Sequence, residues 1–157
     1  MLPLVIFIIA LIVAAIFMQM YSRWEDWVDI VLGSLLFFNV GIFGFMACYA
    51  HTIIPNQTAA LIGWAPGSPF QFEVGMANLA FGVLGVMSLW FQRKFWLATI
   101  VGYSVFLFGA FFGHLIEYSK GNDAPYNIGL FVWFQDLILP IVLLSLLYLH
   151  FKKQYRY

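Results

Sequence analysis

Five long apolar runs, separated by short polar segments, dominate this chain of 157 residues. The first, residues 3–20, carries no charged side chain and is long enough to cross ~30 Å of hydrocarbon as a helix. In lipid, backbone N–H and C=O groups must be hydrogen-bonded within the protein, so such runs are expected to be helical. The sequence therefore predicts an all-α, polytopic membrane protein. The predicted spans are about residues 3–20, 28–50, 72–91, 95–116 and 129–150.

The composition supports a single transmembrane domain over residues 1–157. Hydrophobic residues make up 64% of the chain and charged residues only 9%, whereas soluble domains carry about 25% charged residues. The net charge is zero, which argues against nucleic acid as a partner. The expected partner is the lipid bilayer, and a homo-oligomer or a larger membrane complex stays open. The single cysteine, Cys48, excludes an internal disulfide.

Three features predict how the spans are arranged. The first span lacks polar residues other than Gln19, so it is expected to be a peripheral helix that can face lipid all round. Residues 51–71 contain three prolines but no full positive charge, which predicts an interfacial or re-entrant cap rather than a span. The short turn at Gln92–Lys94 predicts an antiparallel hairpin of the third and fourth spans. A GxxxG pattern at Gly109 and Gly113 predicts a helix contact in the fourth span.

The distribution of basic residues predicts the orientation in the membrane. With five spans, one side holds almost all of the lysines and arginines, and the other side holds only Lys120. The positive-inside rule then places the N-terminus outside and the C-terminus in the cytoplasm. The residues on the basic side are Arg23, Arg93, Lys94, Lys152, Lys153 and Arg156.

Titratable residues from four spans are expected to approach the external face. His114 and Glu117, three residues apart, share one face at the end of the fourth span. His51 ends the second span, and Glu73 begins the third. Asp136 lies about two turns into the fifth span, where Pro140 leaves the carbonyl of residue 136 without its helical partner. These residues are predicted to cluster in the external half of the bundle.

A divalent metal site is the first interpretation of this cluster. Histidines and carboxylates projecting from neighbouring helices suit iron, manganese or zinc, and Cys48, one turn before His51, would shift the preference toward zinc or copper. Such a site could support redox or hydrolytic chemistry at the membrane, so whether the chain is an enzyme stays open. The predicted metal ligands are His51, Glu73, His114, Glu117 and Asp136.

Other interpretations of the same residues remain. The cluster can act without metal as a set of acid–base groups or as a proton relay. Asp136 can be a structural residue bonded to Asn78, Tyr103 or a backbone group, and Glu73 and Glu117 can be wet helix ends. At the level of function, the alternatives are an accessory or binding module for a small molecule or lipid, and a structural subunit of a larger membrane complex.

Residues 63–78 read GWAPGSPFQFEVGMAN and are followed by LAFG. With the further motifs, this GSPFQFE-type segment resembles an uncharacterised family of small bacterial membrane proteins within the DoxX-like group. The resemblance implies a four-helix bundle from spans two to five, a peripheral first helix, and a bacterial inner (plasma) membrane. Some members of the group are associated with membrane oxidoreductase systems, but this chain lacks paired cysteines for thiol–disulfide chemistry. The further motifs are Phe95-Trp96, Gly102-Tyr103, Gly113-His114 and 136–140 (DLILP).

Overall fold

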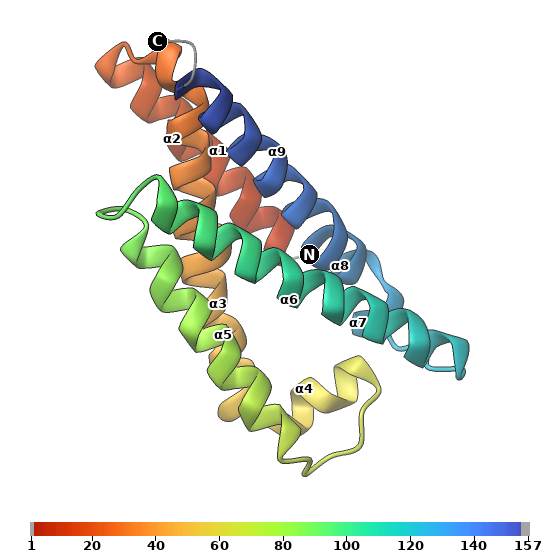
Figure 1. Cartoon of the computed structure of the whole chain (residues 1–157). Helices are drawn as coiled ribbons and strands as arrows, with labels where there is room; N and C mark the ends of the chain where they lie inside the picture. The colour runs from red at the N-terminus through yellow and green to blue at the C-terminus, as the bar shows by residue number, and fades with distance from the viewer. Residues whose placement is uncertain (1, 155–157) are drawn as a thin grey trace.

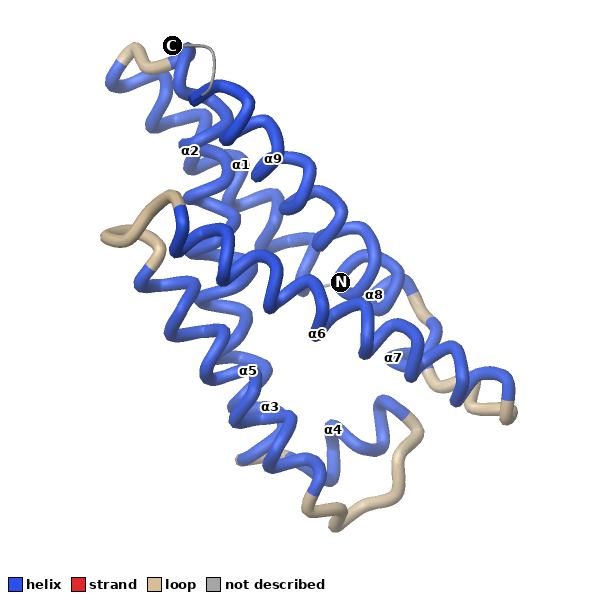
Figure 2. Tube along the Cα trace, viewed as in Figure 1, coloured by secondary structure: helices blue, strands red, loops and turns tan. Residues whose placement is uncertain are grey.

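The structure, a computed structural model, describes residues 2–154, of which none lies in a strand. Short loops join the helices (Figure 2). Five helical segments are long and apolar enough to cross a membrane, as the sequence predicts. They are Leu2–Tyr21, Trp24–Thr52, Phe70–Met87, Lys94–Ser119 and Pro125–Lys153.

Helix α1 (Leu2–Tyr21) is less peripheral than the sequence predicts. Residues spaced three or four apart form one buried stripe along it, and Ala10 and Ala14 in that stripe are fully buried. The stripe packs mainly against α2 (Trp27–Leu35). The remaining faces are exposed, as expected for a helix at the edge of a bundle in lipid. The prediction of lipid on all sides is therefore wrong for this stripe, because small apolar residues suit a helix contact as well as they suit lipid.

The second span is one continuous run built from several helical segments. After a short 3-10 turn, η1 (Trp24–Asp26), it runs through α2, the π-helical segment η2 (Leu36–Ile42) and α3 (Phe43–Thr52). Helix α5 (Phe70–Met87) lies along η2 and α3, as Figure 1 shows. Glycines permit this close approach: a Cβ placed on Gly44 would lie only 2.7 Å from Cα of Gly82. These helices form one arm of the molecule.

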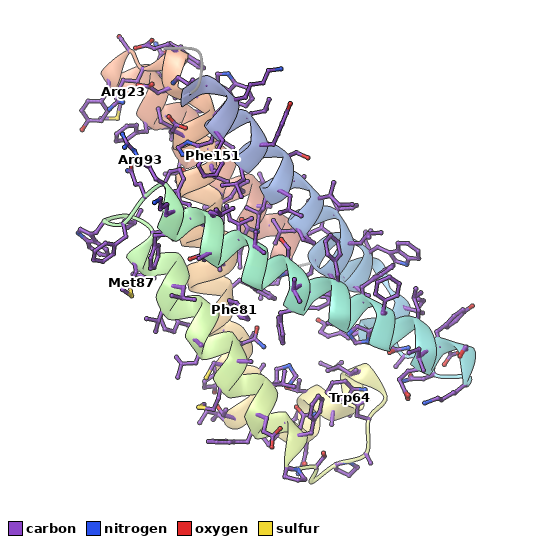
Figure 3. The ribbon with its side chains drawn as sticks, viewed as in Figure 1. Arg23, Trp64, Phe81, Met87, Arg93 and Phe151 are labelled. Carbon is purple, nitrogen blue, oxygen red and sulfur yellow. The ribbon has the colours of Figure 1, made fainter. Side chains whose placement is uncertain are left out.

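Helices α5 and α6 (Lys94–Ser119) diverge from their connecting turn instead of forming a packed hairpin (Figure 1). The turn itself is held by Trp96, whose indole Nε1 donates to the carbonyl of Ser88 at 2.8 Å. Below the turn, the ring of Phe81 lies between the two helices, 5.1 Å from the ring of Tyr103 (Figure 3). The predicted hairpin is thus a V, because the glycine face of α5 is already occupied by α3 and η2.

The fifth span is interrupted twice near its start. It comprises α7 (Pro125–Ile128), α8 (Leu130–Val132), the π-helical segment η3 (Trp133–Ile138) and α9 (Leu139–Gln154). Gly129 is extended and separates α7 from α8. The wide turn of η3 precedes Pro140, which has no N–H to give to the carbonyl of residue 136. Helix α9 then packs against α6, and these two helices form the second arm. Helix α9 also packs against α2, where the two arms join.

Ionic contacts join the start of α2 to the end of α9. His150 Nδ1 lies 2.6 Å from Oδ1 of Asp29, and Lys153 donates to Asp26 at 2.8 Å. Arg23 pairs with the same Asp26. These contacts gather described basic residues at one end of the molecule (Figure 3), while the predicted basic residue Arg156 lies outside the described residues.

The proline-containing segment between the second and third spans folds over the open end of the V. It contains α4 (Pro55–Ile62), followed by residues 63–69 without regular structure. Thr58 donates to the carbonyl of Ala50 at 2.7 Å, which ties α4 back to α3. Asn122, beyond the end of α6, donates to the carbonyl of Ile62 at 3.0 Å. The segment therefore bridges the two arms (Figure 1).

Candidate functional site

A cavity of about 1170 Å³ lies between the two arms, next to α4. Helices α3 and α5 provide one wall, α6 and η3 provide the other, and α4 with the segment after it closes one end. Most of its lining is apolar, and its polar side chains come chiefly from α3, α6 and η3. The apolar lining includes Phe43, Met46, Ala50, Val74, Phe106 and Phe131.

Gly109 and Gly113 form part of the α6 wall. A Cβ on either glycine would meet no neighbouring atom of residues 2–154 within 4 Å, apart from its own helix. Their GxxxG spacing, predicted to be a helix contact, therefore contributes open volume to the cavity in this chain. The helix contact made by glycines is instead the one between α5 and the second span.

The orientation of the His114 ring is set by Asn127. The amide nitrogen of Asn127 donates to two carbonyl oxygens, that of Asn122 at 2.7 Å and that of His114 at 3.3 Å. Carbonyls only accept, so Oδ1 of Asn127 must be the atom that faces Nδ1 of His114, at 2.8 Å. Nδ1 of His114 therefore carries the hydrogen, and Nε2 is an acceptor when the ring is neutral.

Asp136 faces His114 across the cavity wall. Its Oδ2 lies 3.7 Å from Nε2 of His114, which is too long for a hydrogen bond. Asp136 is only 4% exposed, and no residue in the range 2–154 donates a hydrogen bond to its carboxylate. The expected partners Asn78 and Tyr103 are bonded elsewhere: Asn78 donates to the carbonyl of Val74, and Tyr103 accepts from Gln135. The structural interpretation of Asp136 through those two side chains is therefore wrong.

A second histidine lies at the opposite wall. Nδ1 of His51, at the end of α3, is 2.5 Å from Oε1 of Gln71 at the start of α5. Trp64, in the segment after α4 (Figure 3), contacts both histidines: the centroid of its indole lies 6.5 Å from the ring of His51 and 6.4 Å from the ring of His114. The rings of Trp64 and His114 are nearly parallel. Trp64 thus closes the polar end of the cavity.

The five predicted metal ligands divide into two groups. His51, His114, Glu117 and Asp136 line the cavity, whereas Glu73 is exposed at the start of α5 and does not line it. Glu117 accepts from Lys120 at 2.8 Å and is partly exposed, as expected for a wet helix end. Among the described residues, no three His, Cys, Asp or Glu side chains are grouped so that they could hold a metal ion. The metal site stays a prediction that this arrangement does not support.

A family model matches nearly the whole chain, residues 1–156, and its description is a family of unknown function (DUF6790). The chain belongs to this family. No curated protein and no solved structure matches it. Membership of DUF6790 assigns no activity, so the argument for function rests on the site. The resemblance to the DoxX-like group is not tested by the match and stays a prediction.

Several site residues of this DUF6790 chain were missed in the sequence. Asn127 lies in the short polar segment between the predicted fourth and fifth spans, and nothing in its spacing relates it to His114. Gln135 was not predicted to be a site residue, although an amide inside an apolar span indicates a polar site just as the neighbouring carboxylate of Asp136 does. Gln135 donates to Tyr103 at 2.8 Å, and Tyr103 donates to the carbonyl of Asn39 at 3.5 Å. This chain of bonds connects the two π-helical segments through α6.

Proposed function

We propose that this protein binds an amphiphilic small molecule or lipid within the membrane. The ligand's apolar part would occupy the cavity between the arms, and its polar end would lie at His114 and Asp136. The observation that carries this proposal is the cavity itself, whose lining is mostly apolar and whose polar end is the neighbouring group of His51, Trp64, His114 and Asp136. Ligand sites commonly combine a mostly apolar lining with a few convergent polar groups.

The size of the cavity supports a ligand larger than water or a metal ion. Small-molecule pockets usually span ~300–1,000 Å³, and this cavity, at about 1170 Å³, lies just above that range. Its apolar walls would hold no ordered water, because a water molecule needs two to four polar partners. A hydrocarbon chain satisfies such walls without any hydrogen bond.

The exposure of some lining residues supports entry from the bilayer. Val105 of α6 lines the cavity, yet 68% of its surface is exposed, and Met46 of α3 lines it with 40% exposed. Side chains that reach both the cavity and the outer surface are expected where a cavity opens sideways. A ligand with a long apolar chain would then enter without crossing water.

We further infer the orientation predicted by the basic residues. Arg23 and Arg93 lie toward the same end of the molecule (Figure 3), and Trp96, just after Arg93, packs on His150 near the end of α9. Lys120 lies at the opposite end of α6. The positive-inside rule would place the first end in the cytoplasm and the polar end of the cavity toward the outside of a bacterial inner membrane.

A divalent metal at His114 and Asp136 is the second candidate, favoured only by their 3.7 Å approach. Two protein ligands leave most of a coordination shell to water or substrate, which is weak for zinc, iron or copper. Elemental analysis of the purified protein tests this candidate. Stoichiometric metal that is lost in His114→Ala would support it, and the same metal content in both proteins would overturn it.

Native mass spectrometry of the protein in mild detergent tests the proposed binding function. The wild-type protein is expected to carry one additional mass of an amphiphile or lipid. Gly109→Leu places a side chain in the open volume of the cavity and is expected to remove that mass. Val101→Leu is the matched control, because Val101 is an exposed residue on the same helix and does not line the cavity.

Three results of this measurement would count against the proposal. Equal ligand occupancy in Gly109→Leu and in the wild type would overturn it. A heterogeneous set of lipids, equally present in all three proteins, would indicate bulk lipid on the outer surface. A dimer that dissociates in Gly109→Leu would instead show that a helix of a second copy of this chain fills the cavity.

A further inference from the structure

The polar end of the cavity contains hydrogen-bond acceptors and no fixed positive charge. Among the described residues that line the cavity there is no lysine or arginine. The two carboxylates in the lining are Glu117 and Asp136, and Glu117 is paired with Lys120. Asp136 is the deeper of the two and has no lysine or arginine partner among residues 2–154. An anionic head group would therefore find no cation at this end, and it would meet a like charge when Asp136 is ionised.

The hydrogen positions at this end follow from the Asn127 amide. Because Nδ1 of His114 donates to Asn127, the atom of the neutral ring that faces Asp136 is a bare nitrogen. Oδ2 of Asp136 is also an acceptor when the carboxyl group is ionised. With the ring neutral and the carboxyl group ionised, two acceptors thus face each other at 3.7 Å, without a hydrogen between them. Buried acceptors without a donor are costly, so this pair is suited to a donor from outside the chain.

The position of Asp136 is held by the surrounding backbone and side chains. It lies in η3, where the π-helical turn before Pro140 replaces the regular helical bonds. Its neighbour Gln135 is buried and bonded to Tyr103. On the other side, the Asn127 bonds hold His114. The acceptor pair is therefore preorganised on two helices, which lowers the cost of binding a matching group.

We propose that the ligand's polar end is a hydrogen-bond donor without negative charge, a hydroxyl or an ammonium group, which binds between Nε2 of His114 and the carboxylate of Asp136. This inference rests on the proposed binding function and specifies its ligand class. Carboxylate and phosphate head groups are disfavoured, because no lysine or arginine lines the cavity and an ionised Asp136 would repel them. Ethers and esters are disfavoured because they accept hydrogen bonds but do not donate them.

Chain-matched amphiphiles test the head-group preference on the wild-type protein alone. The probes are dodecanol, dodecylamine, dodecanoate and dodecyl methyl ether, titrated at pH 8 and followed by native mass spectrometry. Because only the donors gain a hydrogen bond at this site, dodecanol or dodecylamine is expected to bind at least about tenfold more tightly than the ether or the carboxylate. Dodecanoate or the ether binding as tightly as both donors would overturn the inference.

The same titration separates this inference from the proposed function. If none of the four probes binds, or if Gly109→Leu binds all of them as the wild type does, the proposed function fails. If all four bind equally and Gly109→Leu binds none, the proposed function survives and the donor preference fails.

Asp136→Asn adds a test of the residue itself. The amide keeps the size of the side chain and removes its charge, so dodecanoate is expected to bind within about threefold of dodecanol in this variant. An unchanged tenfold preference would overturn the role of Asp136. If the variant does not fold, the comparison of dodecanol with its methyl ether on the wild type still decides whether a donor is required.

Discussion

Oδ2 of Asp136, in the fifth span, lies 3.7 Å from Nε2 of His114, in the fourth. The two atoms belong to different helices and face each other at the polar end of an otherwise apolar cavity. Polar groups at such depth are costly in a membrane protein and usually mark a site. The structure thus gives the two deepest predicted residues a common location, and it leaves Glu73 outside it.

Asn127→Ala is expected to destabilise the fold by about 1–3 kcal/mol, because it removes the hydrogen bonds of the Asn127 amide to Nδ1 of His114 and to the carbonyls of Asn122 and His114. The measurement is the free energy of unfolding in detergent micelles. Gln57→Ala removes an exposed amide from α4 and is expected to change stability by less than about 0.5 kcal/mol. Equal effects of the two substitutions would argue against a structural role for the Asn127 bonds.

Gly85→Ala is expected to weaken the contact between α5 and the second span. The added Cβ would overlap the backbone of Gly41, and overpacking of this kind costs about 1–3 kcal/mol. Gly102→Ala is the matched control, since its Cβ would lie 3.7 Å from the ring of Phe81, an ordinary contact. Thermal unfolding of both variants measures the difference. A Gly85→Ala protein as stable as Gly102→Ala would contradict the close contact between α5 and the second span at Gly85 and Gly41.

Trp64→Ala is expected to speed the release of a bound amphiphile while leaving the helices folded. The indole covers the polar end of the cavity and stacks on His114, and an aromatic contact is worth about 0.5–1.5 kcal/mol, up to roughly tenfold in the dissociation rate. Trp90→Ala is the control, because Trp90 is 71% exposed and does not line the cavity. The dissociation rate of dodecanol, followed by dilution, is the quantity compared. Identical rates in the two variants would show that Trp64 does not cover the ligand.

Cysteine labelling on intact cells tests the orientation. In a Cys48→Ala background, Asp123→Cys introduces a thiol beyond the end of α6, and Gln92→Cys introduces one at the α5–α6 turn. The positive-inside rule predicts that a membrane-impermeant maleimide labels the first position and not the second. Labelling at Gln92→Cys alone would reverse the orientation.

Much of the helix content could be predicted because it depends on local sequence. Residues 3–20 had to form a helix in lipid, and α1 covers Leu2–Tyr21. The end of α5 was less predictable: the apolar run continues to residue 91, but the helix ends at Met87 and a turn stabilised by Trp96 follows. The contact that stabilises the end of α5 comes from Trp96 on the next helix, and the local sequence of α5 does not indicate it.

The polar cluster was predictable only in part. His114 and Asp136 were identified because imidazole and carboxylate groups are conspicuous in apolar spans. Asn127, which sets the hydrogen positions of His114, comes from a polar segment between two spans. Trp64, which covers the site, comes from the segment predicted to be an interfacial or re-entrant cap, and nothing in that segment relates it to His114. Their roles depend on how the chain folds back over the end of the V.

The amino-acid sequence by itself determined that this chain forms five helical segments long and apolar enough to cross a membrane, because the length of an apolar run and the need to satisfy backbone groups in lipid are local properties. Only the tertiary structure decided that α5 packs on the second span and diverges from α6. The cavity lies between the diverging helices. In lipid, apolar side chains gain little by leaving one apolar neighbour for another, so helix partners are chosen by close packing of small residues. Regularly spaced glycines occur in both α5 and α6. Those of α5 contact the second span, whereas Gly109 and Gly113 of α6 face open volume in the cavity.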